Sequence, residues 1–271
     1  MENELLRKVQ LTQLEMMKVI HNICIDNGIT YYLCGGTTLG AIRHKGFIPW
    51  DDDLDIVLPR KDYDKLMEVL EIQLPPAYWL QNYSTDPSYW QPFAKIRKKG
   101  TVYKEVGMES VDDEKCGVWI DIFPLDIVKK TNSLRLKLRK FMVQTIGFSL
   151  RKRIFGLKYS AFSRRYIPAI CMWGCIPLDK LKKFQVKLMK GKCCDKFSYF
   201  ASLSSSYNIR KETYPCSWFD SGLSVPFEDT KFMIPKNYDS YLTQLFGDYM
   251  QLPPVEKRKG HNISDKTNVI V

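Results

Sequence analysis

The sequence is short of the residues that build disulfide frameworks and thiolate metal sites. It has eight cysteines and three histidines in 271 residues, and the cysteines are scattered apart from the neighbours Cys193 and Cys194. No Cys-x-x-Cys pair of the kind found in zinc sites is present. We therefore expect reduced and mostly buried thiols.

Long apolar runs are also missing. The uncharged, apolar-rich runs at residues 141–150 and 166–178 are shorter than the roughly 18–20 residues that a membrane-spanning helix needs. The first residues, Met1 to Lys8, lack the apolar core of a signal peptide. These two absences predict a cytoplasmic protein that does not cross a membrane.

Acidic residues are almost absent from one part of the chain. Between residues 129 and 192 there are 18 lysines and arginines and a single acidic residue, Asp179, so the segment carries a net charge of +17. The whole chain carries +11, which leaves −6 for the remainder. Apolar residues recur at helical spacing in this segment, for example at Leu134, Leu138 and Phe141, so we expect a basic helical insertion.

The charge of this segment indicates either a solvated helical surface or an anionic partner. No nucleic-acid recognition motif accompanies the cations, and the acidic remainder of the chain would repel a nucleic-acid backbone. An anionic membrane surface fits better, because each lysine or arginine near such a surface contributes about 1 kcal/mol. We therefore predict peripheral binding to the inner face of a membrane and no nucleic-acid partner.

Outside this segment the patterns predict helices mixed with short strands. Apolar spacing of three and four residues indicates helices over residues 5–25, 37–44, 61–74 and 238–246. Strands are indicated over residues 29–34, 53–58, 78–83, 93–98, 102–106 and 118–123. We expect an α+β fold with a mixed sheet and flanking helices. The predicted organisation is a core over residues 1–128, the basic helical insertion over 129–200, and a part over 201–271 that completes the core.

A glycine turn and an acidic cluster stand out between residues 35 and 56. Gly35 and Gly36 open this stretch, a short helix follows, and four aspartates fall within the five residues 51–55. In a strand, Asp51, Asp53 and Asp55 would share one face. Three like charges on one face repel one another unless a cation lies among them, and hard divalent cations such as Mg²⁺ suit oxygen ligands.

Three interpretations of the aspartates compete. An acidic surface turn would not be followed directly by the buried strand that Leu54 and Ile56 predict. An EF-hand calcium loop requires glycine at its sixth position, where this chain has Ile56, and glutamate at its twelfth, where it has Asp62. A metal site for phosphoryl or nucleotidyl transfer explains both the carboxylates and the glycine turn, whose N–H groups can approach a phosphate.

A third carboxylate is available later in the chain. Asp121 lies in the middle of an apolar strand pattern, where a carboxylate is costly unless a charged partner or a metal meets it. The alternation predicts that Trp119, Asp121 and Phe123 share one face. Asp126 is the weaker candidate, because we expect it in a turn beyond Pro124.

At these residues the sequence resembles the LicD family, which is named for bacterial phosphocholine transferases and is related to the fukutin-type ribitol-phosphate transferases. The resemblance rests on the whole stretch 35–56, on 59–63, on Lys95-Ile96-Arg97, on 121–126, and late in the chain on 234–239, Tyr241-Leu242 and Tyr249. It covers most of the chain except the basic segment. It implies a nucleotidyltransferase-like fold, and transfer of phosphocholine or a similar alcohol phosphate from a CDP-linked donor to a cell-surface glycan precursor, which we expect to be lipid-linked.

The predicted roles follow from the cluster and the resemblance together. The metal ligands would be Asp51, Asp53, Asp55 and Asp121, holding Mg²⁺ with Mn²⁺ as the alternative ion, and the catalytic residues would be Asp53, Asp55 and Asp121. The donor would be bound by Gly35, Gly36, Thr37, Arg43, His44, Lys95 and Arg97, where alternation puts Lys95 and Arg97 on one strand face. The alternative function is a metal-dependent nucleotidyltransferase that acts on a small molecule or a protein. The sequence assigns no role to His261.

Overall fold

The computed structural model describes residues 2–105, 108, 111–129, 133–156, 167–191, 199–205, 207–258, 260 and 269–271. Its helices are α1 (Glu2–Asp26), α2 (Gly35–Arg43), α3 (Arg60–Gln73), α4 (Leu134–Phe155), α6 (Ile167–Met172), α7 (Leu178–Met189) and α8 (Tyr238–Phe246). Its strands are β1 (Tyr32–Leu33), β2 (Asp55–Pro59), β3 (Tyr78–Gln81), β4 (Ala94–Lys98), β5 (Trp119–Val128), β6 (Tyr199–Ala201), β7 (Thr213–Pro215), β8 (Leu223–Phe227) and β9 (Thr230–Ile234). The predicted α+β class is confirmed.

The principal sheet has the strand order β1-β2-β5-β4-β3. β1 pairs antiparallel with β2, with Tyr32 opposite Val57. β6 pairs antiparallel with the last residues of β5 and also with β7, while β8 and β9 form a separate two-stranded sheet. β1 and β2 are consecutive in the chain, as are β3 and β4, whereas β2 and β5 are neighbours that lie far apart in sequence.

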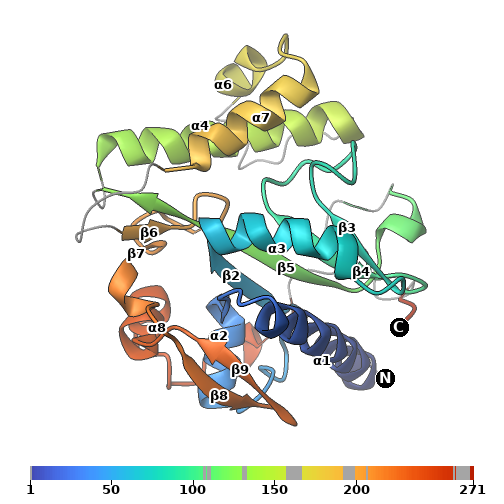
Figure 1. Cartoon of the computed structure of the whole chain (residues 1–271), viewed down its shortest axis with the longest axis vertical. Coiled ribbons are helices and arrows are strands. Elements are labelled where there is room, and N and C mark those ends of the chain that lie inside the picture. The colour runs from blue at the N-terminus through green and yellow to red at the C-terminus, as the bar shows by residue number, and fades with distance from the viewer. Residues whose placement is uncertain are drawn as a thin grey trace. The chain divides into compact units, whose positions relative to one another are not determined.

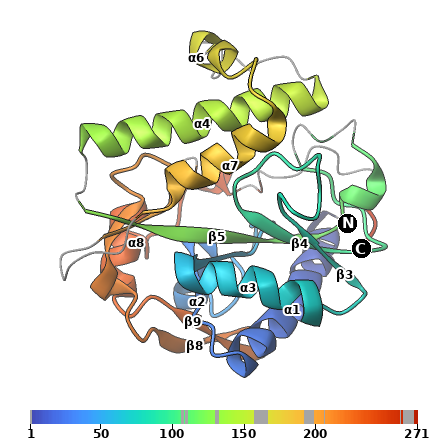
Figure 2. The ribbon, with the colours of Figure 1, turned by 45° about the horizontal axis from the view of Figure 1, so that its top comes forward.

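The chain forms two compact units. Unit 1 comprises residues 1–80, 95–123 and 217–271, and unit 2 comprises residues 81–94 and 124–216. In unit 1, α2 packs against α8 and against the β8–β9 hairpin (Figure 1). In unit 2, α4 packs along α7, and α6 also packs on α4 (Figure 2). β5 continues from one unit into the other, because its residues up to Phe123 belong to unit 1 and the rest to unit 2.

The long amphipathic helices agree with the sequence patterns. α1, α3 and α8 lie within a few residues of the predicted spans, and Gly28 ends the first helix with a positive φ of 58°. α1 buries Val9, Met17 and Ile20, while α3 buries Leu66 and Leu70. The basic segment is helical as predicted, with α4, α6 and α7 in its described part.

The start of β2 and the end of β5 differ from the predicted boundaries. β2 begins at Asp55 rather than Asp53, so the other three aspartates lie in the loop before it. β5 does not stop before Pro124 but continues to Val128, so the prediction that Asp126 lies in a turn was wrong. Proline is tolerated there because the strand changes partners, pairing with β6 only from Asp126 onward.

One further strand prediction failed. Residues 102–105 form no extended strand, since Val102 makes only an isolated bridge to Ile270. That bridge pairs residues that are far apart in sequence. Such pairings between distant residues leave no local pattern. Val106 and residues 261–268, with His261, lie outside the described residues.

None of the helices in the described parts of the chain combines the length and the apolar character needed to cross a membrane. Six cysteines lie among the described residues and all are free thiols. Cys24, Cys34 and Cys116 are buried, but Cys171 and Cys175 are exposed, so the prediction of buried thiols holds only in part. Cys193 and Cys194 lie outside the described residues.

Candidate active site

The turn before α2 and the aspartate loop are built against each other. Gly35 adopts a positive φ of 52°, which favours glycine, and its N–H donates to the Tyr241 hydroxyl at 2.9 Å. A Cβ added at Gly36 would lie 2.8 Å from Asp51 Oδ2, closer than real Cβ contacts allow. The absence of a side chain at Gly36 therefore lets the Asp51 carboxylate lie against the first turn of α2.

The threonines that follow link the helix to the neighbouring strands. Thr37 Oγ1 accepts from the Asp55 N–H at 2.9 Å, and Thr38 Oγ1 donates to the Leu33 carbonyl at 2.6 Å. The Asp55 carbonyl in turn accepts from the Cys34 N–H at 3.1 Å. These bonds fix the start of β2, and with it Asp55, to the first turn of α2.

Two buried glutamines of α1 donate hydrogen bonds to the backbone of the aspartate loop. Gln10 Nε2 donates to the Asp51 carbonyl at 2.9 Å, and Gln13 Nε2 donates to the carbonyls of Asp52 and Trp119, both at 3.2 Å. The sequence patterns did not identify Gln10 and Gln13 as part of the site. The signal was available, because both glutamines lie on the apolar side of an amphipathic helix, where a polar side chain needs a buried partner.

Asp51, Asp53 and Asp55 repel one another, although Asp51 and Asp53 lie in the loop before β2 and not on a strand face as predicted. The side chains of Asp51 and Asp53 are within hydrogen-bonding range. Burial raises the pKa of Asp51 well above its usual value, and the charges of Asp53 and Asp52 raise it further. Burial likewise raises the pKa of Asp55, with Asp53 and Asp121 adding to the effect. The ionised forms of these carboxylates therefore lack sufficient positive charge nearby.

The Asp52 side chain has a hydrogen-bond partner of its own. It is buried, and its Oδ2 accepts from the Tyr103 hydroxyl at 3.2 Å. Burial and the Asp52 charge raise the pKa of Tyr103, so the phenol remains a donor. Tyr103 also packs on the Trp119 ring, with 5.0 Å between centroids. Asp52 is thus a structural residue beside the cluster, which agrees with the predicted division of the aspartates.

Asp121 of β5 joins the cluster and brings a cation with it. Its N–H donates to the Leu54 carbonyl at 3.1 Å, next to Asp53 and Asp55. Lys95 Nζ of β4 contacts Asp121 Oδ1 at 2.5 Å. Burial raises the pKa of Asp121 to about 6, although the Lys95 ammonium opposes that rise. The prediction that this carboxylate needs a charged partner is confirmed.

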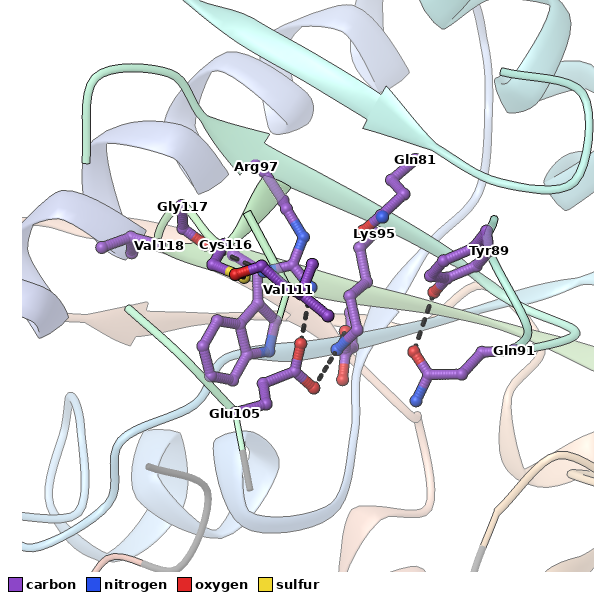
Figure 3. Close-up of polar contacts among 12 residues, drawn as sticks. Gln81, Tyr89, Gln91, Lys95, Arg97, Glu105, Val111, Cys116, Gly117 and Val118 are labelled. Atoms are coloured by element: carbon purple, nitrogen blue, oxygen red, sulfur yellow. Dashed lines mark hydrogen bonds and ion pairs between the residues drawn. The ribbon is translucent and has the colours of Figure 1, made fainter. Parts of the chain in front are cut away.

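Lys95 belongs to a buried ion network that the sequence did not reveal (Figure 3). Its ammonium also contacts Glu105 Oε2 at 3.0 Å, and Arg97 Nη2 contacts Glu105 Oε1 at 2.5 Å. Both cations lie over the Trp119 ring, at 4.9 Å and 5.5 Å from its centroid. Burial alone would raise the pKa of Glu105, but Lys95 and Arg97 outweigh it and lower the pKa to about 2.

The shared strand face of Lys95 and Arg97 is therefore confirmed, whereas direct binding of donor phosphate by them stays a prediction. Both side chains are almost fully buried, and Arg97 Nη1 donates to the Gly117 carbonyl at 2.9 Å. Their contacts favour positioning of Asp121 over contact with a ligand. Glu105 had no sequence signal, because it lies in an irregular segment and its partners are eight and ten residues away.

Arg43 and His44, at the end of α2, are bound to the C-terminal part of unit 1. Arg43 Nη1 donates to the Tyr249 carbonyl at 2.7 Å, and Arg43 Nε to His44 Nε2 at 2.9 Å. Burial, then the charge of Arg258, lowers the pKa of Arg43. Arg258 itself stacks on the Trp50 ring, 5.4 Å from the centroid. Two cations and an aromatic ring thus gather beside the aspartate loop, where an anion would relieve their mutual repulsion.

The aspartate carboxylates repel one another, and a divalent cation among them would be stabilising. Asp55 Oδ1 is buried and has no hydrogen-bond partner, and the carboxylates of Asp51 and Asp55 have raised pKa values. A cation between them would satisfy that oxygen and lower the repulsion. Within the described residues, however, no three or more carboxylate, histidine or cysteine side chains have the spacing of a complete metal site. The ligand set Asp51, Asp53, Asp55 and Asp121 therefore stays a prediction.

The residues of this site lie within the part of the chain that matches a known family. The family model described as "LicD/FKTN/FKRP, nucleotidyltransferase domain" matches residues 28–169, a span that includes α2, the aspartate loop, Lys95 and Asp121. The lipopolysaccharide cholinephosphotransferase LicD of Haemophilus influenzae is 30% identical over 265 residues, which cover 96% of this chain and 97% of the relative.

Two shorter matches are to uncharacterized proteins of Rickettsia prowazekii and Rickettsia typhi. They are 43% and 41% identical over 63 residues, or 23% of this chain and 24% and 20% of the two proteins. The full-length match and the family model carry the assignment. This chain belongs to the LicD family.

Proposed function

We propose that this chain transfers phosphocholine from a CDP-linked donor to a hydroxyl group of a glycan precursor. The observation that carries the proposal is the 30% identity, over nearly the full length of both chains, to a lipopolysaccharide cholinephosphotransferase. The acidic cluster of unit 1 supports the proposal in two ways. Transfer of a phosphorus group requires charge neutralisation around the pyrophosphate, which a divalent cation held by the aspartates would supply, and it requires a base for the attacking hydroxyl, which a carboxylate can be.

The chemistry divides among residues of unit 1. The acceptor hydroxyl attacks the phosphorus that bears choline, the bond from that phosphorus to the bridging oxygen breaks, and cytidine monophosphate leaves. Asp121 accepts the hydroxyl proton. Its pKa of about 6 suits this role, because the group is mostly ionised at neutral pH and still basic. Lys95 holds the carboxylate in place.

The donor pyrophosphate would lie by the first turn of α2, with Gly35, Gly36 and Thr37 presenting backbone and hydroxyl groups. Arg43 supplies positive charge at the other end of that helix. Burial and the Arg43 charge lower the pKa of His44, so its neutral imidazole would contribute a hydrogen bond and no charge. Asp53 and Asp55, assisted by Asp51, are the residues that would hold Mg²⁺, or Mn²⁺ in its place. A bound divalent ion would neutralise charge on the pyrophosphate.

The test is product analysis with CDP-choline, Mg²⁺ and a glycan acceptor. We expect release of cytidine monophosphate, and at least about a thousandfold slower release by Asp53→Asn. Unchanged release by that variant in the presence of Mg²⁺ would contradict the metal assignment. Titration of the protein with Mg²⁺ in a calorimeter, with and without CDP-choline, checks metal binding separately from turnover.

A second function is favoured by one observation, the nucleotidyltransferase domain named in the family description. Such an enzyme would leave the nucleotide on a small molecule or a protein and release pyrophosphate. Product analysis separates the two functions, since the proposed transferase releases cytidine monophosphate and no pyrophosphate.

We also propose that the acceptor is lipid-linked and that the protein works at the inner face of a membrane. The charge of the basic segment supports this location, because its +17 complements anionic lipids.

A further inference from the structure

The first half of α4 exposes apolar side chains on one side of the helix. Leu134 is 82% exposed, Leu138 53% and Phe141 37%. These residues are four and three positions apart, so they line one stripe along nearly two turns. On the opposite side of the same helix, Leu136 and Val143 are buried in the core of unit 2. α4 is therefore apolar on two sides, and among the described residues only one of these sides is covered.

Single exposed apolar residues occur elsewhere and need no explanation. Ile72 of α3 is 86% exposed, but the residues three and four positions before it on the same helix are Val69 and Glu68, and Glu68 is charged. The stripe on α4 differs because three apolar side chains continue one another at helical spacing. A surface helix normally presents a polar face to water, so this arrangement indicates a partner.

The charges around the stripe identify the kind of partner. Arg135 and Lys137 are exposed and flank the stripe on its two sides. Both cations lie near the start of α4, which is the positive end of the helix dipole, and there they destabilise the helix. The first turn has no acidic residue to compensate for them. An external anionic surface would compensate for that cost. Long cationic side chains that flank an apolar stripe are the pattern of helices that lie in a membrane interface.

We infer that the stripe Leu134–Leu138–Phe141, with Arg135 and Lys137, is the surface by which unit 2 docks on an anionic lipid bilayer. The leucines and the phenylalanine enter the interface between headgroups and acyl chains, and the two cations bind lipid phosphates. The net charge of +17 between residues 129 and 192 supplies attraction at longer range. The inference rests on the proposed function for its purpose, which is access to a lipid-linked acceptor.

Flotation of the full-length protein with vesicles tests the docking surface without donor or turnover. Vesicles of equal parts phosphatidylglycerol and phosphatidylcholine should bind the protein at low salt, and phosphatidylcholine vesicles should not. Leu134→Gln with Leu138→Gln should weaken binding at least about tenfold, since both apolar contacts are lost. Arg135→Glu with Lys137→Glu should weaken it at least about 25-fold, since each cation contributes about fivefold.

Matched control variants lie in unit 1. Ile72→Gln removes an equally exposed apolar residue, and Lys61→Glu reverses an exposed cation, both on α3. Neither should change vesicle binding by more than about twofold. Circular dichroism should be unchanged in every variant, because all the substituted side chains are exposed. The thermal midpoint should also be unchanged, except that the two glutamates of the cation variant should raise it slightly at the start of α4.

Three results would overturn the inference. The first is that the wild-type protein does not float with anionic vesicles at low salt. The second is that the leucine variant binds like the wild type. The third is that the leucine and Ile72 variants weaken binding equally. Nucleic-acid binding that is lost in the cation variants, with vesicle binding unaffected by the leucine variants, would assign the face to a polyanion instead. A protein that releases cytidine monophosphate but never floats keeps the proposed function and loses the docking surface.

Discussion

Two of the buried lysines, Lys95 in unit 1 and Lys140 in unit 2, have opposite surroundings. Lys95 of unit 1 is 1% exposed and contacts the carboxylates of Asp121 and Glu105. Lys140 of unit 2 is 5% exposed, and its ammonium donates to the Tyr207 carbonyl at 2.6 Å. Burial lowers the pKa of Lys140 to about 8, with only partial compensation by Glu212.

The difference separates the candidate site from the framework. In unit 1 buried charges are collected into a network that holds Asp121 beside the aspartate loop. In unit 2 the buried lysines Lys140 and Lys182 are tolerated as part of the packed pair of α4 and α7, and most other cations of that helix pair face solvent. Under the proposed function, the buried and paired charges of unit 1 would serve the chemistry, and the exposed cations of unit 2 would serve attraction to an anionic surface. Four experiments test this comparison, from the largest expected effect to the smallest.

The largest effect should come from Lys95→Met. Removal of the ammonium leaves Asp121 and Glu105 without a shared cation in a buried place, which should destabilise the protein by about 4 kcal/mol. Turnover should fall at least about a hundredfold, because Asp121 loses its support. The control is Lys183→Met on the exposed side of α7, which should change stability by less than about 0.5 kcal/mol. Denaturant unfolding and kinetics measure both, and equal effects at the two lysines would break the comparison.

The next effect concerns stability at alkaline pH. The pKa of Lys140 is lowered from 10.5 to about 8, so between these values the unfolded chain binds more protons than the folded one. Its contribution to the free energy of unfolding should therefore rise with pH from about 8 to 10.5, by about 3 kcal/mol. Lys140→Met should remove that rise in urea unfolding measured across this range, and Lys183→Met should keep it. A rise that persists in Lys140→Met contradicts the assignment.

A smaller effect is expected from two glutamates, the partly exposed Glu105 of unit 1 and the buried Glu212 of unit 2. Glu105→Gln weakens the contacts to Lys95 and Arg97 and should cost about 2 kcal/mol, because the amide oxygen still accepts one hydrogen bond. Since the folded pKa of Glu105 is depressed to about 2, this contribution is present above pH 4.5 and lost as the pH falls toward 2.

Glu212 of unit 2 is the matched control for Glu105. Burial raises its pKa, and the hydroxyls of Ser205 and Tyr214 donate to it at 2.7 Å and 3.0 Å. Glu212→Gln should change stability by less than about 1 kcal/mol at neutral pH, since an amide oxygen accepts the same bonds. A larger loss at Glu212 than at Glu105, measured by urea unfolding, would contradict the proposed difference between the units.

The smallest change in stability should accompany Gly36→Ala. Its new Cβ would lie 2.8 Å from Asp51 Oδ2 and would displace that carboxylate, so we expect about tenfold slower turnover and a stability change below about 1 kcal/mol. Gly147→Ala in α4 is the control, because its Cβ would meet only Gln185 Nε2 at 3.5 Å. That variant should keep full activity and gain up to about 1 kcal/mol in thermal unfolding. Normal turnover in Gly36→Ala would show that the Asp51 carboxylate is not needed at its observed position.

The sequence by itself determined the helices of unit 1 and the members of the acidic cluster. Apolar spacing identified α1, α3 and α8, since each helix must bury one side. The aspartates and Asp121 could be predicted because a carboxylate beside a buried strand requires a partner. These conclusions depend on neighbours in sequence, where the pattern is local.

Only the tertiary structure decided how the cluster is held. Gln10 and Gln13 reach the aspartate loop from about 40 residues away in sequence, and Glu105 meets Lys95 and Arg97 through an irregular segment. Continuation of β5 through Pro124 likewise depends on its pairing with β6. Hydrogen bonds and ion pairs between distant residues leave no periodicity in the sequence, because their geometry exists only once the chain has folded.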